Sequence, residues 1–142
     1  MRVKKSTGWR LGFVATLLLS LGLVTACRSA ETEAQPLPEI QTELLVRAPD
    51  GPLPVNKSIE VRSRTDASAG VSHVDLYVTL PDNQEVLVRS DAAAFQQKSF
   101  TASQTFTPKQ VGHYIIKVVG YNLQGKSYSS NAIGFDVQVP PS

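Results

Sequence analysis

Apolar and polar residues alternate along several short segments of this chain, and this two-residue period is its strongest constraint on the fold. In residues 72–80 every second residue from Val74 to Leu80 is apolar, and residues 112–122 repeat the pattern from Tyr114 to Val118. Successive side chains of a β-strand point to opposite faces, so this period predicts strands with one buried face. No comparable helical period occurs after residue 41.

Seven segments of this kind follow one another, separated by turn sequences such as Pro49-Asp50-Gly51-Pro52 and Leu123-Gln124-Gly125-Lys126. The predicted strands are 43–48, 58–65, 72–80, 85–89, 98–107, 112–122 and 128–139. Short strands with a turn roughly every dozen residues are typical of a two-sheet antiparallel sandwich. We therefore expect residues 42–140 to form one all-β sandwich domain of about seven strands.

The first 26 residues have the composition of a secretory signal. Residues 1–10 carry four basic residues and no acid, and residues 11–26 carry no charge. A basic segment, an apolar segment and a small residue before the cleavage point, here Ala26, are the parts of such a signal. The apolar segment is shorter than the roughly 20 residues that a spanning helix needs. We expect residues 1–26 to be a cleaved signal peptide.

The single cysteine of the chain, Cys27, directly follows this segment. The sequence Leu23-Val24-Thr25-Ala26-Cys27 resembles the lipobox of bacterial lipoproteins. This resemblance implies cleavage between Ala26 and Cys27 and a diacylglycerol on the cysteine sulfur. An ordinary cleavage site that leaves a free thiol and an uncleaved single-pass anchor are the alternatives. An odd cysteine in an exported protein needs an explanation, and lipid attachment supplies one, so we favour the lipobox.

Residues 27–41 are the predicted link between the lipid and the domain. They are polar and contain Pro36 and Pro38, a composition typical of a flexible tether. The expected location is therefore extracytoplasmic, with the lipid on Cys27 in the bacterial cell membrane or an outer membrane. An aspartate after the cysteine often retains lipoproteins at the inner membrane, and Arg28 in its place favours the outer one.

The charge of the chain argues against nucleic acid as a partner. The sequence has 14 basic and 12 acidic residues, a formal net charge of +2. Four of the basic residues lie in the segment that we expect to be removed, which leaves 10 against 12, or −2. Nucleic-acid binding proteins present a basic surface, and the predicted mature chain has no such excess.

Three stretches of the predicted domain resemble bacterial immunoglobulin-like modules. They are Ala69 to Val78, Phe106-Thr107-Pro108 followed by Val111-Gly112-His113-Tyr114, and Val118 to Ser127. The resemblance implies an immunoglobulin-like antiparallel sandwich, with Tyr114 as the tyrosine of a tyrosine corner. Asn122 stands where the family often has aspartate, which argues against a calcium-supported turn. Because such sandwiches host many activities, the resemblance does not identify the function.

The domain shows no pattern of catalytic or metal-binding residues. His73 and His113 have no further ligands at zinc-site spacing, and we interpret them as solvated surface side chains. There is no G-x-S-x-G sequence for a nucleophilic serine. Acids that folding could pair for glycoside hydrolysis are Glu85 with Asp91 and Asp66 with Asp75. Twelve acids in so short a chain produce such pairs by chance, so we expect no enzyme, metal or cofactor.

Tyr77, Val119 and Tyr121 are the candidate binding residues. They lie on the strand faces opposite the predicted core, and neighbouring strands would join them into an exposed apolar patch. Such patches bind proteins or carbohydrates, although long neighbouring side chains can also cover them. We therefore predict a non-catalytic module for binding or adhesion, whose partner is an envelope protein or a glycan. The alternative is a structural accessory subunit or spacer of an envelope complex that adds an edge strand to a neighbour.

Overall fold

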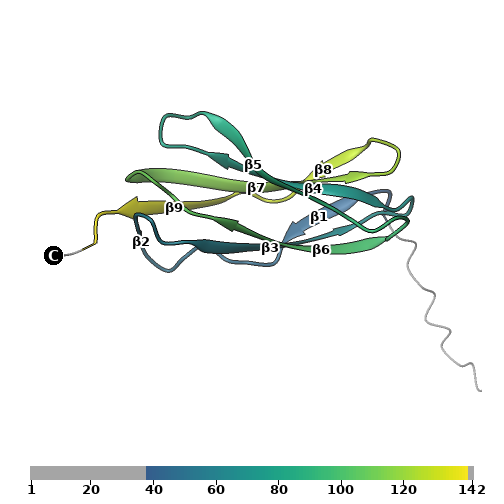
Figure 1. Cartoon of the computed structure of the whole chain (residues 1–142), viewed down its shortest axis with the longest axis horizontal. Coiled ribbons are helices and arrows are strands. Elements are labelled where there is room, and N and C mark those ends of the chain that lie inside the picture. The colour runs from purple at the N-terminus through teal and green to yellow at the C-terminus, as the bar shows by residue number, and fades with distance from the viewer. Residues whose placement is uncertain (1–37, 141–142) are drawn as a thin grey trace, which may run out of the picture. The chain divides into compact units, whose positions relative to one another are not determined.

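The computed structural model describes residues 38–140, which form two β-sheets packed face to face (Figure 1). The predicted signal peptide, Cys27 and residues 28–37 of the predicted tether lie outside the described residues. Within 38–140 no helix has the length and apolar character needed to cross a membrane. The strands are β1 (Gln41–Leu44), β2 (Leu53–Pro54), β3 (Ile59–Asp66), β4 (Val71–Thr79), β5 (Glu85–Ala92), β6 (Ser99–Phe106), β7 (Gly112–Asn122), β8 (Ser127–Ser129) and β9 (Ile133–Gln138).

The smaller sheet has the order β1-β3-β6, and the larger has the order β2-β9-β7-β4-β5 with β8 also pairing with β7. All neighbours are antiparallel except β2, which runs parallel to β9. The predicted all-β antiparallel sandwich is therefore confirmed. The short parallel pair is the one departure from the expected antiparallel pairing.

The core lies between the sheets and consists of the alternate residues that the sequence period indicated. Along β4 the inward side chains Val74, Leu76 and Val78 are fully buried, and β7 contributes Tyr114, Ile116 and Val118. The smaller sheet offers a more polar inner face, with Ser63, Thr65 and Gln104 buried beside apolar residues. The Gln104 side chain donates a 3.2 Å hydrogen bond to the carbonyl of Val74, which links the two sheets.

The first predicted strand, 43–48, is wrong beyond Leu44. After Leu45 the chain leaves the smaller sheet and crosses to the larger one, where β2 pairs with β9. Pro49 and Pro52 lie in this crossing, and proline cannot donate to a strand ladder. At the other end, the folded region begins before the expected boundary at 42, since Gln41 pairs with Asp66 and Ile40 packs against the core.

The last predicted strand, 128–139, is divided into β8 and β9 at Ser130. The backbone N–H of Val118 donates to the Ser130 hydroxyl at 3.0 Å, where a continuous strand would offer a carbonyl. The Ser130 N–H donates to the Val118 carbonyl at 2.8 Å. The Ser130 hydroxyl replaces a backbone carbonyl as the acceptor for the Val118 N–H. Regular strand pairing is therefore interrupted between β8 and β9.

The predicted tyrosine corner is present at the start of β7. The Tyr114 hydroxyl donates to the carbonyl of Gln110 at 3.0 Å and accepts from the Gln110 N–H at 3.2 Å. Gly112 has φ +135°, and a Cβ there would lie 2.8 Å from the Pro81 side chain. The corner therefore needs glycine two residues before the tyrosine, both for its backbone angle and for its contact with the β4–β5 turn.

Candidate binding surface

The pairing of β4 with β7 brings the three candidate residues together on the outer face of the larger sheet. Tyr77 lies opposite Lys117, and Val119 and Tyr121 lie opposite Asp75 and His73 respectively. Tyr77, Val119 and Tyr121 are each half-buried. The neighbouring side chains thus cover part of the predicted patch and leave part of it accessible.

His73 is a member of this surface that the sequence interpretation missed. Its ring stacks on Tyr121, with 4.4 Å between ring centroids and 8° between ring planes, and its Nδ1 lies 3.0 Å from the Ser72 hydroxyl. The His73 side chain is 35% exposed at the surface, but it is not freely solvated, because β4 is an inner strand of the sheet and Tyr121 covers one face of the ring. His113, by contrast, is exposed and pairs with Asp136 at 2.8 Å.

Asp75 lies between His73 and Tyr77 on the same face of β4, with its Oδ2 3.9 Å from the His73 Nε2. Its side chain is only 9% exposed, and its Oδ2 accepts a 3.5 Å hydrogen bond from the Tyr77 hydroxyl. Its Oδ1 is buried and has no hydrogen-bond partner among the described protein atoms. A buried carboxylate oxygen without a donor is energetically costly. The Asp75 carboxylate is therefore a buried polar group beneath the surface, with one oxygen bonded to Tyr77 and the other without a partner among the described residues.

Tyr77 is held as a neutral phenol. A side-chain hydrogen bond with Tyr121, partial burial and the charge of Asp75 together raise the pKa of Tyr77 to about 12. The ammonium of Lys117 lies 5.7 Å from the centre of the Tyr77 ring, and the same ammonium pairs with Glu85 at 2.7 Å. The cation–π contact and the hydrogen bonds hold the Tyr77 ring against β7 and Asp75.

β5 extends the apolar part of the surface. Leu87 pairs with Tyr77 and is 53% exposed, whereas Ile115 on β7 is 36% exposed. We call His73, Tyr77, Leu87, Val119 and Tyr121 the outer aromatic face. Leu87 was missed because a bulge between Leu76 and Tyr77 shifts the register of β5, which the sequence period does not reveal.

The acids that folding could have paired, Glu85 with Asp91 and Asp66 with Asp75, form ion pairs with basic residues or lie in different sheets. Asp66 in β3 pairs with Arg64 at 3.0 Å, while Asp75 lies in the other sheet. On β5, Asp91 pairs with Arg89 at 2.8 Å, and Glu85 pairs with Lys117 near the other end of the strand.

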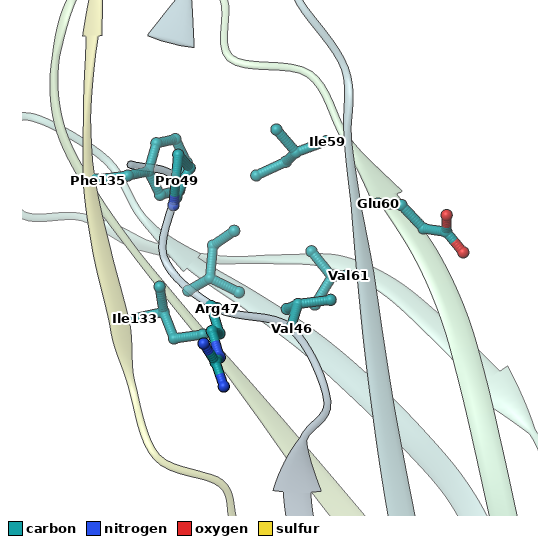
Figure 2. Close-up of a pocket in the computed structure, with 9 residues that line it drawn as sticks. Val46, Arg47, Pro49, Ile59, Glu60, Val61, Ile133 and Phe135 are labelled. Carbon is teal, nitrogen blue, oxygen red and sulfur yellow. The ribbon is translucent and has the colours of Figure 1, made fainter. Parts of the chain in front are cut away.

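A separate apolar cavity of about 320 Å³ lies between the sheets, near the segment that crosses from β1 to β2. Side chains of β3 and β9 point into it from opposite sides, whereas the Glu60 carboxylate points away (Figure 2). Its lining comprises Val46, Arg47, Pro49, Ile59, Glu60, Val61, Ile116, Ile133 and Phe135.

Comparison with known proteins identifies the fold. No family model matches the chain, and no curated protein matches its sequence. Among solved structures, the fibronectin(III)-like modules of Clostridium thermocellum CbhA are 19% identical with a TM-score of 0.54, covering 72% of this chain and 100% of that one. The sensor domain of an anti-sigma factor of Pseudobacteroides cellulosolvens is 15% identical with a TM-score of 0.50, covering 72% and 98%. At these identities the likeness shows the fold alone, and residues 38–140 form an immunoglobulin-like β-sandwich.

Proposed function

We propose that this protein is a non-catalytic binding module, held on the extracytoplasmic side of a bacterial membrane by lipid on Cys27. The sequence supports the anchor through the stretch 23–27 and the signal before it. The outer aromatic face supports the binding role, because it combines accessible apolar area with fixed polar groups. Its partner is an envelope protein or a glycan.

The observation that carries the binding role is the group of half-buried rings that His73, Tyr77 and Tyr121 form on the outer face of the larger sheet. Aromatic rings offer a flat apolar surface to a ligand. The Tyr77 hydroxyl donates to Asp75 Oδ2 at 3.5 Å, and its oxygen can still accept a hydrogen bond. A face of this kind suits a ligand that presents both an apolar side and a hydrogen-bond donor.

The double variant Tyr77→Ala/Tyr121→Ala tests this role. We expect it to lose the partner recovered by in-cell cross-linking, or the glycan bound on an array, with the array distinguishing the two ligand classes. Tyr128→Ala is the matched control, because Tyr128 is 50% exposed and lies on β8 outside the outer aromatic face. Retention of every partner by the folded double variant would exclude the face as the binding site.

The anchor has its own test. We expect Cys27→Ala to abolish metabolic labelling with palmitate and to leave the precursor unprocessed. Cys27→Ser serves as the closest variant in size that lacks a thiol. Normal maturation and unchanged membrane retention in both variants would contradict lipid attachment at this residue.

A structural accessory role is the second candidate, and the edge strand β5 favours it. β5 ends the larger sheet, and Leu87 and Val88 on it are 53% and 37% exposed. Unprotected edge strands pair readily with strands of a neighbour. The structural role predicts that the protein copurifies with a stoichiometric envelope complex. Disruption of that complex by Val88→Pro would favour this role over ligand binding by the outer aromatic face.

A further inference from the structure

β1 protects only part of the edge of β3, and the remainder is open. The two strands pair from Gln41 opposite Asp66 to Leu44 opposite Ser63. One further bond follows, from the Leu45 N–H to the Arg62 carbonyl at 2.8 Å. Beyond it β3 continues to Ile59, and on this side no strand accompanies it within residues 38–140.

The free part of the edge presents the backbone of Glu60. Peptide groups of a strand point alternately to its two sides, and the Arg62 carbonyl points toward β1. The N–H and carbonyl of Glu60, two residues away, therefore point the same way, away from β6. Among the described residues neither group has a backbone partner on that side. Such a pair is the unit to which an added strand hydrogen-bonds.

The 320 Å³ apolar cavity lies beside this free edge. Ile59 and Val61 border it on β3, and Ile133 and Phe135 border it on β9 (Figure 2). Val46, Arg47 and Pro49 of the crossing segment also border the cavity, but within the described chain no backbone hydrogen bond joins residues 46–52 to β3. A strand added at Glu60 would direct alternate side chains toward the cavity, since alternate residues share a face.

Two arginines without ion-pair partners among the described residues flank the edge. Arg47 lines the cavity, and Arg62 follows Glu60 by two residues; both are exposed. Neither arginine forms a salt bridge with a residue between 38 and 140. The Glu60 carboxylate accepts the Ser103 hydroxyl on the outer surface instead of pairing with either arginine. The charges therefore complement an acidic ligand.

We propose that this edge binds an extended acidic peptide of a partner protein. Its main chain bonds to the Glu60 N–H and carbonyl, one large apolar side chain fills the cavity, and flanking carboxylates pair with Arg47 and Arg62. An acyl chain would fit the apolar lining but would leave the Glu60 backbone unsatisfied. The free backbone edge therefore favours a peptide. This site lies between the sheets and is separate from the outer aromatic face.

The probe is a capped synthetic peptide, Thr-Glu-Leu-Glu-Thr, added to the full-length protein in detergent, with Thr-Lys-Leu-Lys-Thr as its matched control. We expect the acidic peptide to slow hydrogen exchange of the Glu60 amide and the basic peptide to have no effect. Glu60→Pro removes the amide that donates to the peptide without removing a bond to β6, so we expect about tenfold weaker binding.

A charge-reversal variant tests the site without touching the backbone. Arg47→Glu/Arg62→Glu should reverse the preference, so that the basic peptide binds more tightly than the acidic one. Tyr77→Ala/Tyr121→Ala should bind the acidic peptide normally, because those residues lie on the outer face of the other sheet. Equal binding by Glu60→Pro, or an unchanged preference after charge reversal, would overturn the proposal.

Discussion

Gly120→Ala is expected to destabilise the fold strongly, although alanine normally suits a strand better than glycine. Gly120 faces the core from β7, where a Cβ would lie 2.3 Å from Thr42 Oγ1 and 2.6 Å from Thr65 Cγ2. These two threonine hydroxyls form a buried 3.0 Å hydrogen bond between β1 and β3. The glycine therefore lets the two sheets approach at this point.

The magnitude follows from two costs. Overpacking a tight core typically costs about 1–3 kcal/mol, and loss of the Thr42–Thr65 hydrogen bond costs about 1 kcal/mol. We expect Gly120→Ala to lower the free energy of unfolding by about 2–4 kcal/mol. Urea unfolding followed by far-UV circular dichroism measures this directly, with the change appearing in the midpoint rather than the slope.

Two variants make the result interpretable. Gly51→Ala is the control, because a Cβ there meets nothing within 4 Å, and its effect should stay within about 0.5 kcal/mol. Adding Thr42→Ala to Gly120→Ala removes the closest atom, so the cost of the alanine should fall in that background. A Gly120→Ala protein as stable as the parent, or strict additivity with Thr42→Ala, would refute this packing of β7 against the smaller sheet.

Three further predictions concern single side chains. Tyr114→Phe should lower stability by about 1–3 kcal/mol, because both Gln110 backbone groups lose their partner; an unchanged urea midpoint would contradict this. In an absorbance titration, one tyrosine should ionise near pH 12, and this titration step should be missing from Tyr77→Phe. This pKa lies above the unfolded value near 10, so the contribution of Tyr77 to the free energy of unfolding is complete below pH 10 and is lost as pH rises to 12. Tyr77→Phe should therefore lose less stability than the parent between pH 10 and pH 12. Ser130→Ala should speed hydrogen exchange of the Val118 amide, and unchanged exchange would show that the hydroxyl is dispensable.

The inner strands were predictable because their burial follows the sequence period. Residues 112–122 and most of 72–80 match β7 and β4. Burial on one face forces alternation, since a shift of one residue would expose the whole apolar set. The tyrosine corner was also predictable, because it depends on residues close together in the sequence, Gln110 to Tyr114.

The edges of the sheets were less predictable because tertiary contacts decide them. The crossing of the chain after Leu45 depends on which sheet accepts β2, and the break at Ser130 depends on a hydroxyl that replaces one backbone partner. The same limit applied to the candidate surface. Tyr77 and Tyr121 were found from strand alternation, whereas the stacking of His73 needed the register between β4 and β7.

Site-specific photo-cross-linking in cells tests the proposed binding role most directly. A photoreactive residue at position 87 would lie on the outer aromatic face, and one at position 99 would lie on β6 in the other sheet, opposite Asp66 and far along the strand from Glu60. The proposed role predicts adducts from position 87 that disappear in the Tyr77→Ala/Tyr121→Ala background, and none from position 99. Adducts that form from position 99 alone, or that persist from position 87 in the double variant, would contradict it.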